Sequence, residues 1–191
     1  MINVQNYIEF KDCMSTLKEA SKDDNDKNNI RYMINDTRDV VDFDMVKTKY
    51  ANKLGLSEEV AKSVDVLYDG KNKDVFIEFK NGNMANQKSA VRDKVRNSLL
   101  LFGDITGRSI SYTRNSAEFV LVYNEEKNTD IKRVKKSSVQ NSESRDKIAG
   151  VVHRYAKEEF VRFGMEIFKG LFFRDVHTYT VKEFSEYLFK V

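Results

Sequence analysis

Residues 63–80 have the sequence SVDVLYDGKNKDVFIEFK, in which two apolar runs flank a polar turn. Both runs are rich in Val, Ile, Tyr and Phe, whereas the Asp, Gly and Asn between them tolerate turn geometry. The pattern predicts a β-hairpin with adjacent antiparallel strands at Val64–Tyr68 and Asp74–Lys80. Because side chains alternate along a strand, Glu78 and Lys80 are expected on one face of the sheet.

The hairpin also brings Asp65 opposite the end of the strand that carries Glu78 and Lys80. Two carboxylates and an ammonium in one small space make chemical sense if a divalent cation lies between the carboxylates and the lysine faces a nucleophilic water. The alternative is an exposed hairpin whose charged residues pair weakly across the strands. The apolar neighbours of Glu78 count against it, because a buried strand rarely carries two charges without a partner.

This spacing of charged residues resembles the PD-(D/E)xK nuclease superfamily, in which the proline is often replaced. Val64-Asp65 stands for the first motif element and Glu78-Phe79-Lys80 for the second, and the resemblance covers about residues 57–124. It implies a restriction-endonuclease-like core and hydrolysis of phosphodiester bonds in DNA or RNA. It further implies Mg²⁺ or Mn²⁺ bound by Asp65, Glu78 and the backbone carbonyl of Phe79, with Lys80 orienting the attacking water.

A helix predicted from Met84 to about Phe102, and closed by Gly103, follows the motif. In the superfamily, a Gln or Lys near the start of this helix often completes the active site, which makes Gln87 and Lys88 candidates. If the polar stripe of the helix faces the cleft, it contacts nucleic-acid phosphates through Gln87, Lys88, Arg92 and Arg96. The alternative is an ordinary solvated stripe.

Many members of the superfamily also place a carboxylate on an early helix. Four residues qualify by position, and none has a compelling register: Glu9, Glu19, Glu58 and Glu59. The two histidines, His153 and His177, form no metal-ligand pattern and are interpreted as structural.

The remaining pattern predicts helices and strands on both sides of the motif. Before it, we expect a helix over Asn3–Ser21, an ambiguous segment over Ile30–Val41 that holds at most a short strand, a helix capped by Asp42 or Asp44 and ended by Gly55, and a short helix capped by Ser57. After it, we expect a central strand at Phe119–Tyr123, a helix over Ser144–Lys169, a late strand over Leu171–His177 and a terminal helix opened by the capping box Thr180-Val181-Lys182-Glu183.

Composition sets the class of protein. A chain of 191 residues is long enough for one domain with a sizeable core, so we predict a single domain over 1–191. The order of elements favours an α/β fold with a mixed sheet flanked by helices on both faces. The polar and basic segment 125–144 is predicted to be a mobile loop, and its run at 132–136 either contacts phosphates or is simply solvated.

Charge and hydropathy exclude some partners. The net charge of +3 is too small to indicate a nucleic-acid binder by itself, so local clusters matter more. No stretch approaches the ~20 apolar residues of a membrane span, and no secretion signal is evident. Cys13 is the single cysteine, which excludes an internal disulfide and favours a reducing cytoplasm; we expect its thiol to be buried.

Two functions from different classes are compatible with these residues. The first is a Mg²⁺- or Mn²⁺-dependent nuclease that acts on DNA or RNA. The second is an inactive nuclease-like protein that binds a protein partner or nucleic acid, as antitoxin or toxin-immunity proteins do. The set of Asp65, Glu78 and Lys80 favours the first, whereas the weak positive charge and the lack of a clear third carboxylate favour the second.

Overall fold

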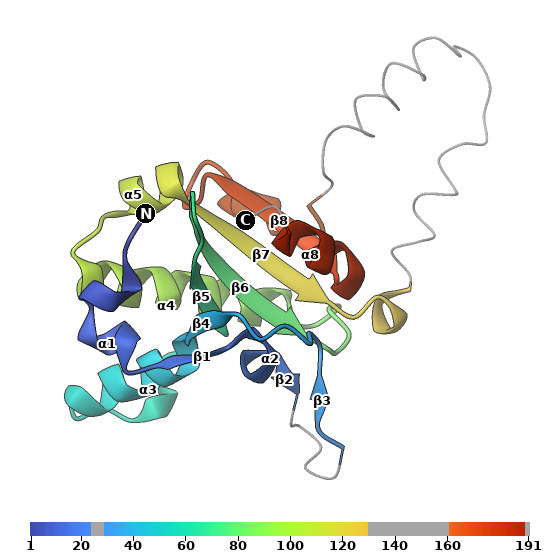
Figure 1. Cartoon of the computed structure of the whole chain (residues 1–191). Coiled ribbons are helices and arrows are strands. Elements are labelled where there is room, and N and C mark those ends of the chain that lie inside the picture. Colours follow the sequence, from blue (N-terminus) through green and yellow to red (C-terminus); the bar gives the residue numbers. More distant parts are fainter. Residues whose placement is uncertain (24–28, 130–160, 190–191) are drawn as a thin grey trace.

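The computed structural model describes residues 1–23, 29–129 and 161–189, and it places a six-stranded mixed sheet at the centre of the fold (Figure 1). Its strands are β1 (Met14–Thr16), β4 (Asp39–Asp42), β5 (Val66–Asp69), β6 (Asp74–Lys80), β7 (Ala117–Tyr123) and β8 (Asp175–Thr180). They lie in the order β1-β4-β5-β6-β7-β8. Neighbours from β1 to β6 are antiparallel, whereas β6, β7 and β8 are parallel, which confirms the predicted α/β class.

The predicted hairpin is present as β5 and β6. Val66 lies opposite Ile77 and Asp69 opposite Asp74, so the polar residues between them form the turn as expected. The predicted strand Phe119–Tyr123 lies within β7, which is buried along its whole length and pairs with β6 in parallel. Because β7 lies between two parallel strands, β6 and β8, helices cover both of its faces. This explains the continuous apolar sequence of β7.

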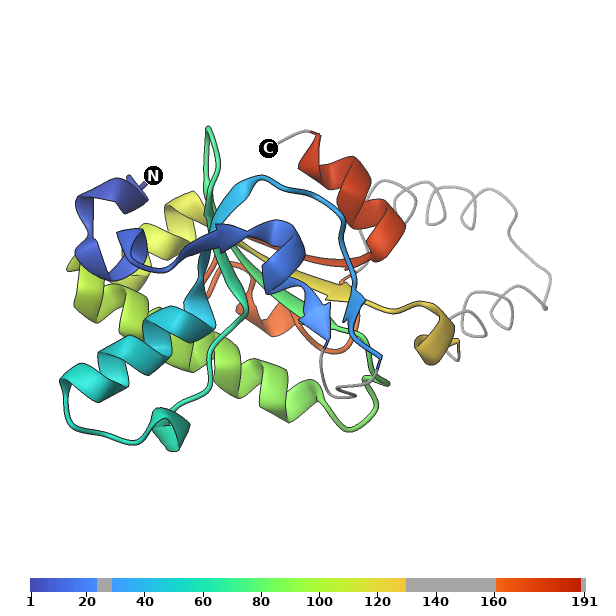
Figure 2. The ribbon, with the colours of Figure 1, turned by 60° about the horizontal axis from the view of Figure 1, so that its bottom comes forward.

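Helices cover both faces of the sheet (Figure 2). One face packs against α3 (Phe43–Lys53) and α4 (Lys88–Thr106), and the other against α2 (Leu17–Ala20) and α8 (Val181–Leu188). Alternation along β6 decides which side chains go where. Phe76 belongs to the core under α4, whereas Ile77 and Phe79 belong to the core under α8, so Glu78 faces the α4 side with Phe76.

The predicted single helix over Asn3–Ser21 is wrong. The segment forms η1 (Val4–Asn6), α1 (Ile8–Lys11), β1 and α2 in succession. Residues 14–16 pair with β4 instead of continuing the helix, with Met14 opposite Val41. The Thr16 hydroxyl then accepts a hydrogen bond from the Glu19 N–H and starts α2 as a new helix. Tertiary strand pairing has therefore overridden the local helical periodicity.

Three further boundaries differ from the prediction. The helix after the motif is α4, which starts at Lys88 and ends at Thr106. Gly107 is its C-cap, with a left-handed φ of 67° that glycine tolerates. Residues 161–169 contain no α-helix but only the 3-10 turn η4 (Glu166–Phe168), while 144–160 lie outside the described residues. The late strand β8 begins at Asp175 rather than at residue 171.

Helix ends follow the predicted caps. Asp42 caps α3 through the Met45 N–H, Ser57 caps η2 (Glu58–Val60), and Thr180 and Glu183 form the capping box of α8. The ambiguous segment holds β3 (Arg31–Tyr32), which pairs with β2 (Lys22–Asp23), and the first part of β4. The other elements are α5 (Ile110–Ser116) and η3 (Glu126–Asn128).

Several remaining predictions concern burial or fall outside the described residues. Cys13 is buried, as expected. In the parts of the chain that the structure describes, no helix is long and apolar enough to cross a membrane. Most of the predicted loop at 125–144, the basic run 132–136 and His153 lie outside the described residues.

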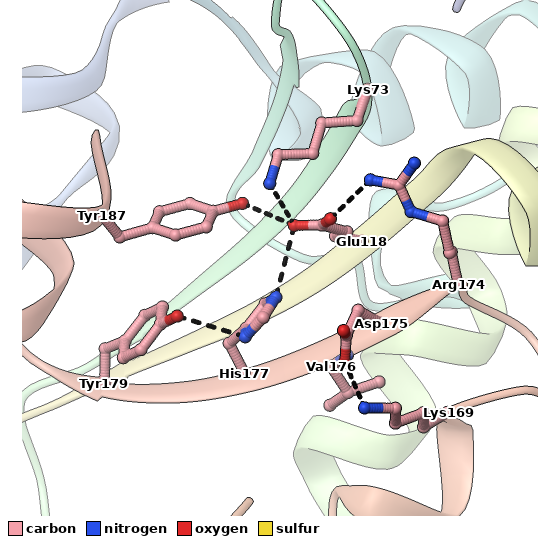
Figure 3. A network of polar contacts seen from close by, with 9 residues as sticks. All are labelled: Lys73, Glu118, Lys169, Arg174, Asp175, Val176, His177, Tyr179 and Tyr187. Carbon is pink, nitrogen blue, oxygen red and sulfur yellow. Dashed lines mark hydrogen bonds and ion pairs between the residues drawn. The ribbon is translucent and has the colours of Figure 1, made fainter. Parts of the chain in front are cut away.

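A buried polar cluster joins β7, β8, α8 and the hairpin turn (Figure 3). Glu118 on β7 accepts hydrogen bonds from the Lys73 ammonium at 2.6 Å, the Arg174 guanidinium at 2.7 Å and the Tyr187 hydroxyl at 2.8 Å. Its Oε2 also lies 3.3 Å from His177 Nε2. Although burial opposes the charge of Glu118, these contacts together lower its pKa, and His177 is placed in a structural role.

Candidate active site

Asp65 and Glu78 meet where β5 begins beside β6. The backbone of Asp65 is fixed on both sides, because its N–H donates to the Ile77 carbonyl and its carbonyl accepts from the Phe43 N–H. The preceding Val64 N–H donates to the hydroxyl of Ser98 on α4 at 2.9 Å. Strand pairing and one helix contact therefore hold the Asp65 side chain over the α4 face of the sheet.

The ammonium of Lys94, a residue of α4, bridges the two carboxylates. Its Nζ lies 3.0 Å from Asp65 Oδ1 and 2.9 and 3.0 Å from the two oxygens of Glu78. Two acidic side chains from different strands thus share one cation. Two charges of the same sign this close are tolerated only because a positive charge lies between them.

Lys80 contacts Glu78 from the end of β6. Its Nζ lies 2.8 Å from Glu78 Oε1, as the alternation of side chains along β6 predicts. The exposed fraction of the side chain rises outward through the cluster, from 0% for Glu78 to 16% for Lys94, 18% for Asp65 and 22% for Lys80. Glu78 is therefore the innermost group, and the other three shield it.

Burial dominates the protonation of the two acids. It raises the pKa of Glu78 to about 7, with the nearby charge of Asp65 adding to the effect and the two lysines opposing it. Burial also raises the pKa of Asp65. For Lys94, burial alone would lower the pKa, but the charges of Asp65 and Glu78 outweigh it and raise the pKa, so the ammonium stays charged.

A cavity of about 660 Å³ opens beside this cluster. Asp65, Phe79, Lys80 and Gln87 line it, together with the segment from Glu19 to Asp23. Glu78 and Lys94 do not line the cavity, since they lie behind Asp65 and Lys80. A molecule in the cavity therefore meets Asp65 and Lys80 first.

The early carboxylates that the sequence nominated separate into two groups. Glu19 lines the cavity together with Asp65. Glu9 instead forms an ion pair with Lys53 at 3.2 Å, and the exposed Glu58 and Glu59 lie on η2 and do not line the cavity. Glu19 is thus the early acid that the fold brings to the site.

Two acids at the start of α3 were not nominated from the sequence. Asp42 and Asp44 line the same cavity as Asp65. Asp42 caps α3, and Asp44 accepts a hydrogen bond from the Ser63 hydroxyl at 2.6 Å. Burial raises the pKa of Asp42, and the charges of Asp44 and Asp65 add to the rise. The cavity is therefore rich in carboxylates.

The stripe of Lys88, Arg92 and Arg96 does not reach the cavity wall. Lys88 is exposed at the start of α4, whereas the Arg92 guanidinium donates to the Gly164 carbonyl at 2.8 Å. Arg96 pairs with Asp93 and lies over the ring of Phe168. Of the four predicted nucleic-acid contacts, only Gln87 lines the cavity.

Lys94 is the residue of this cluster that the sequence did not nominate. It lies on the inward side of α4, between the buried Val91 and Val95 and one turn before Ser98. A lysine inside an otherwise apolar inward stripe was the available signal, since a buried ammonium requires acidic partners.

Asp65 and Glu78 offer oxygen donors of the kind that a divalent cation such as Mg²⁺ prefers. Among the described residues, no three Asp, Glu, His or Cys side chains come together as a metal-binding group. Mg²⁺, however, often binds one or two carboxylates and completes its coordination shell with water. The carboxylates of Asp65 and Glu78 already lie around one positive group, the Lys94 ammonium. The carbonyl of Phe79 is directed to the same side, because its N–H donates to Asp65 and both groups of a strand residue face one neighbour.

Comparisons of this chain with protein-family models, with curated proteins and with solved structures found no match. Any assignment of function therefore depends on the geometry of Asp65, Glu78, Lys80 and Lys94 and on the cavity beside them.

Proposed function

We propose that this protein is a metal-dependent nuclease that hydrolyses phosphodiester bonds in DNA or RNA with Mg²⁺ or Mn²⁺. The observation that carries the proposal is that the Asp65 and Glu78 carboxylates both contact one positive group, the Lys94 ammonium. They do so beside Lys80 and next to a cavity. Structural ion pairs are usually formed by one acid and one base. Two acids that converge on one point, one buried and one partly buried, are the arrangement that a divalent cation needs.

In this proposal, Asp65 and Glu78 hold the cation, and the Phe79 N–H keeps the Asp65 carboxylate turned toward Glu78. The cation supplies activation of water and stabilisation of negative charge on the scissile phosphate. Lys80 lines the cavity with its ammonium 2.8 Å from Glu78, so it can donate a hydrogen bond to the attacking water and to the phosphate. Glu19 faces the same space and can accept a proton from the water.

The substrate occupies the cavity, which Gln87 lines together with Asp65 and Lys80. Lys88, exposed beside Gln87 at the start of α4, is the nearest of the predicted phosphate contacts. Such contacts to phosphate attract DNA and RNA alike and carry no sequence information.

The test is cleavage of labelled single- and double-stranded DNA and RNA with Mg²⁺ or Mn²⁺. The wild type is compared with Glu78→Ala and with the control Glu186→Ala, which removes an exposed glutamate of α8. We expect cleavage by the wild type and the control but not by Glu78→Ala. Equal cleavage by all three proteins, or no cleavage by the wild type on any substrate, would refute the proposal.

One observation favours the second candidate function, a catalytically inactive protein that binds a partner as antitoxin or toxin-immunity proteins do. Glu78 is fully buried, and Lys94 forms ion pairs with both acids from within the protein. In that case the four charged residues form a closed structural network, and a partner protein or nucleic acid binds elsewhere. Retained binding of nucleic acid or protein without any metal dependence would support this candidate.

A further inference from the structure

We infer that Lys94 is an internal counter-ion that competes with the divalent cation for one position between Asp65 and Glu78. The inference rests on the proposed function in that it requires the acid pair to bind a metal. It adds that metal entry and withdrawal of the Lys94 ammonium are one event.

The geometry makes the two cations mutually exclusive. The Lys94 ammonium touches Asp65 Oδ1 and both oxygens of Glu78 at 2.9–3.0 Å. A Mg²⁺ ion must approach the same oxygens to ~2.0–2.1 Å. An ammonium and a dication cannot both occupy the space between these two carboxylates, because they repel each other and share the same donors.

Lys94 rather than Lys80 holds this position. Lys80 contacts Glu78 alone and lines the cavity, whereas Lys94 contacts both acids and lies behind them. Lys80 can therefore stay in place beside a bound cation, as the proposed function requires. Lys94 cannot.

Withdrawal of Lys94 requires rotation of its side chain and no change in the helix. Val91, Val95 and Ser98 anchor α4 on either side of it, and the four-carbon stem of a lysine allows its ammonium to swing away. In the metal-free protein, Lys94 keeps two buried acids compatible. The acids are thus held close together before a cation arrives, and the cost of displacing Lys94 weakens metal binding.

The experiment measures Mn²⁺ affinity by calorimetry for the wild type, Lys94→Met and the control Lys182→Met. Methionine keeps the length and apolar stem of lysine but carries no charge, and Lys182 is an exposed lysine of α8, on the other face of the sheet. We expect Lys94→Met to bind Mn²⁺ about tenfold or more tightly than the wild type, since no ammonium must be displaced. Lys182→Met should match the wild type.

The outcomes separate this inference from the proposed function. If the wild type binds Mn²⁺ and Lys94→Met binds it with the same or lower affinity, the competition between Lys94 and the metal is refuted, whereas the proposed metal-dependent nuclease is not. Absence of Mn²⁺ binding in both proteins would overturn both.

A second measurement covers the case in which Lys94→Met folds poorly, because it leaves two acids without a counter-ion. Thermal unfolding with and without Mn²⁺ should show a larger rise in Tm for Lys94→Met than for the wild type. The double variant Lys94→Met/Glu78→Gln relieves the repulsion and should lose that rise. Failure of any Mn²⁺ concentration to stabilise Lys94→Met would contradict the inference.

Discussion

The backbone N–H of Phe79 donates a 2.6 Å hydrogen bond to Asp65 Oδ2. This bond stands where the antiparallel ladder of β5 and β6 would otherwise continue, since the Asp65 N–H has just donated to the Ile77 carbonyl. A side chain has thus replaced a backbone acceptor at the end of the hairpin. The consequence is that the Asp65 carboxylate is held beside Glu78 by the strand pairing itself.

This relationship makes Asp65→Asn informative. Asparagine keeps an acceptor for the Phe79 N–H but loses the charge that faces Lys94. We expect a loss of about 1–2 kcal/mol in the free energy of unfolding. Metal-dependent cleavage should fall about 100-fold or more, because ~3 kcal/mol of charge stabilisation is removed. Urea unfolding and single-turnover cleavage measure the two effects, and wild-type cleavage by Asp65→Asn would exclude Asp65 from the site.

Glu78 should impose a pH dependence on stability. Its pKa is raised from 4.5 to about 7 in the folded protein, so the folded state binds more protons than the unfolded state between these values. The free energy of unfolding should therefore decrease as the pH rises from about 4.5 to about 7 and level off above. At ~1.36 kcal/mol per pKa unit, the effect reaches at most about 3 kcal/mol.

The matched variant for this pH effect is Glu78→Gln, which cannot ionise. Urea unfolding at several pH values between 4.5 and 8 should give a wild-type curve that falls relative to the variant curve across this window. Parallel curves would mean that Glu78 does not titrate in the folded protein as proposed.

Glu118 should act in the opposite direction. Its pKa is lowered by His177, Lys73, Arg174 and Tyr187 against the effect of burial, so its contribution is present above the ordinary pKa of a glutamate and is lost as the pH falls. Glu118→Gln should lower the free energy of unfolding near pH 7 by about 2–4 kcal/mol, because Lys73 and Arg174 lose the buried carboxylate that they contact. The difference from the wild type should shrink below about pH 4. A constant difference at all pH values would contradict this account.

Arg92 and Lys88 should differ in their effects, although the sequence placed both on one stripe. The Arg92 guanidinium holds the Gly164 carbonyl, so Arg92→Ala should cost about 1–2 kcal/mol of stability and leave the salt dependence of nucleic-acid binding unchanged. Lys88 is exposed, so Lys88→Ala should leave stability unchanged and reduce the salt slope by about 1 if it contacts a phosphate. Titration of nucleic acid at several salt concentrations measures the slopes. Equal slopes for Lys88→Ala and the wild type would exclude Lys88 as a contact.

The sequence predicted those parts of the fold that depend on local patterns. The hairpin of β5 and β6, the buried strand β7 and the caps at Asp42, Ser57 and Thr180 were all confirmed, because alternation, turn residues and capping side chains act over a few residues. The helix over Asn3–Ser21 was not, because residues 14–16 pair with β4, which follows α2, β2 and β3 in the chain, and no local pattern reports that pairing.

The site was predictable in its strand residues and not in its helix residues. Asp65, Glu78 and Lys80 come together through one hairpin, so their spacing was sufficient. Lys94 enters from α4, and which side of that helix faces the acids depends on how the helix packs on the sheet. The same limit applies to Asp42 and Asp44, which reach the cavity only through the β4–α3 connection.

A crystal structure of the protein soaked with Mn²⁺, with anomalous scattering measured for the metal, tests the central claim most directly. The account predicts one Mn²⁺ ion bonded to carboxylate oxygens of both Asp65 and Glu78 at about the ~2.0–2.2 Å typical of hard divalent cations on oxygen ligands. It also predicts that the Lys94 ammonium has left the 2.9–3.0 Å contacts that it makes with these oxygens. A structure at millimolar Mn²⁺ with no metal at this position, and with Lys94 still bridging the two acids, would contradict the account.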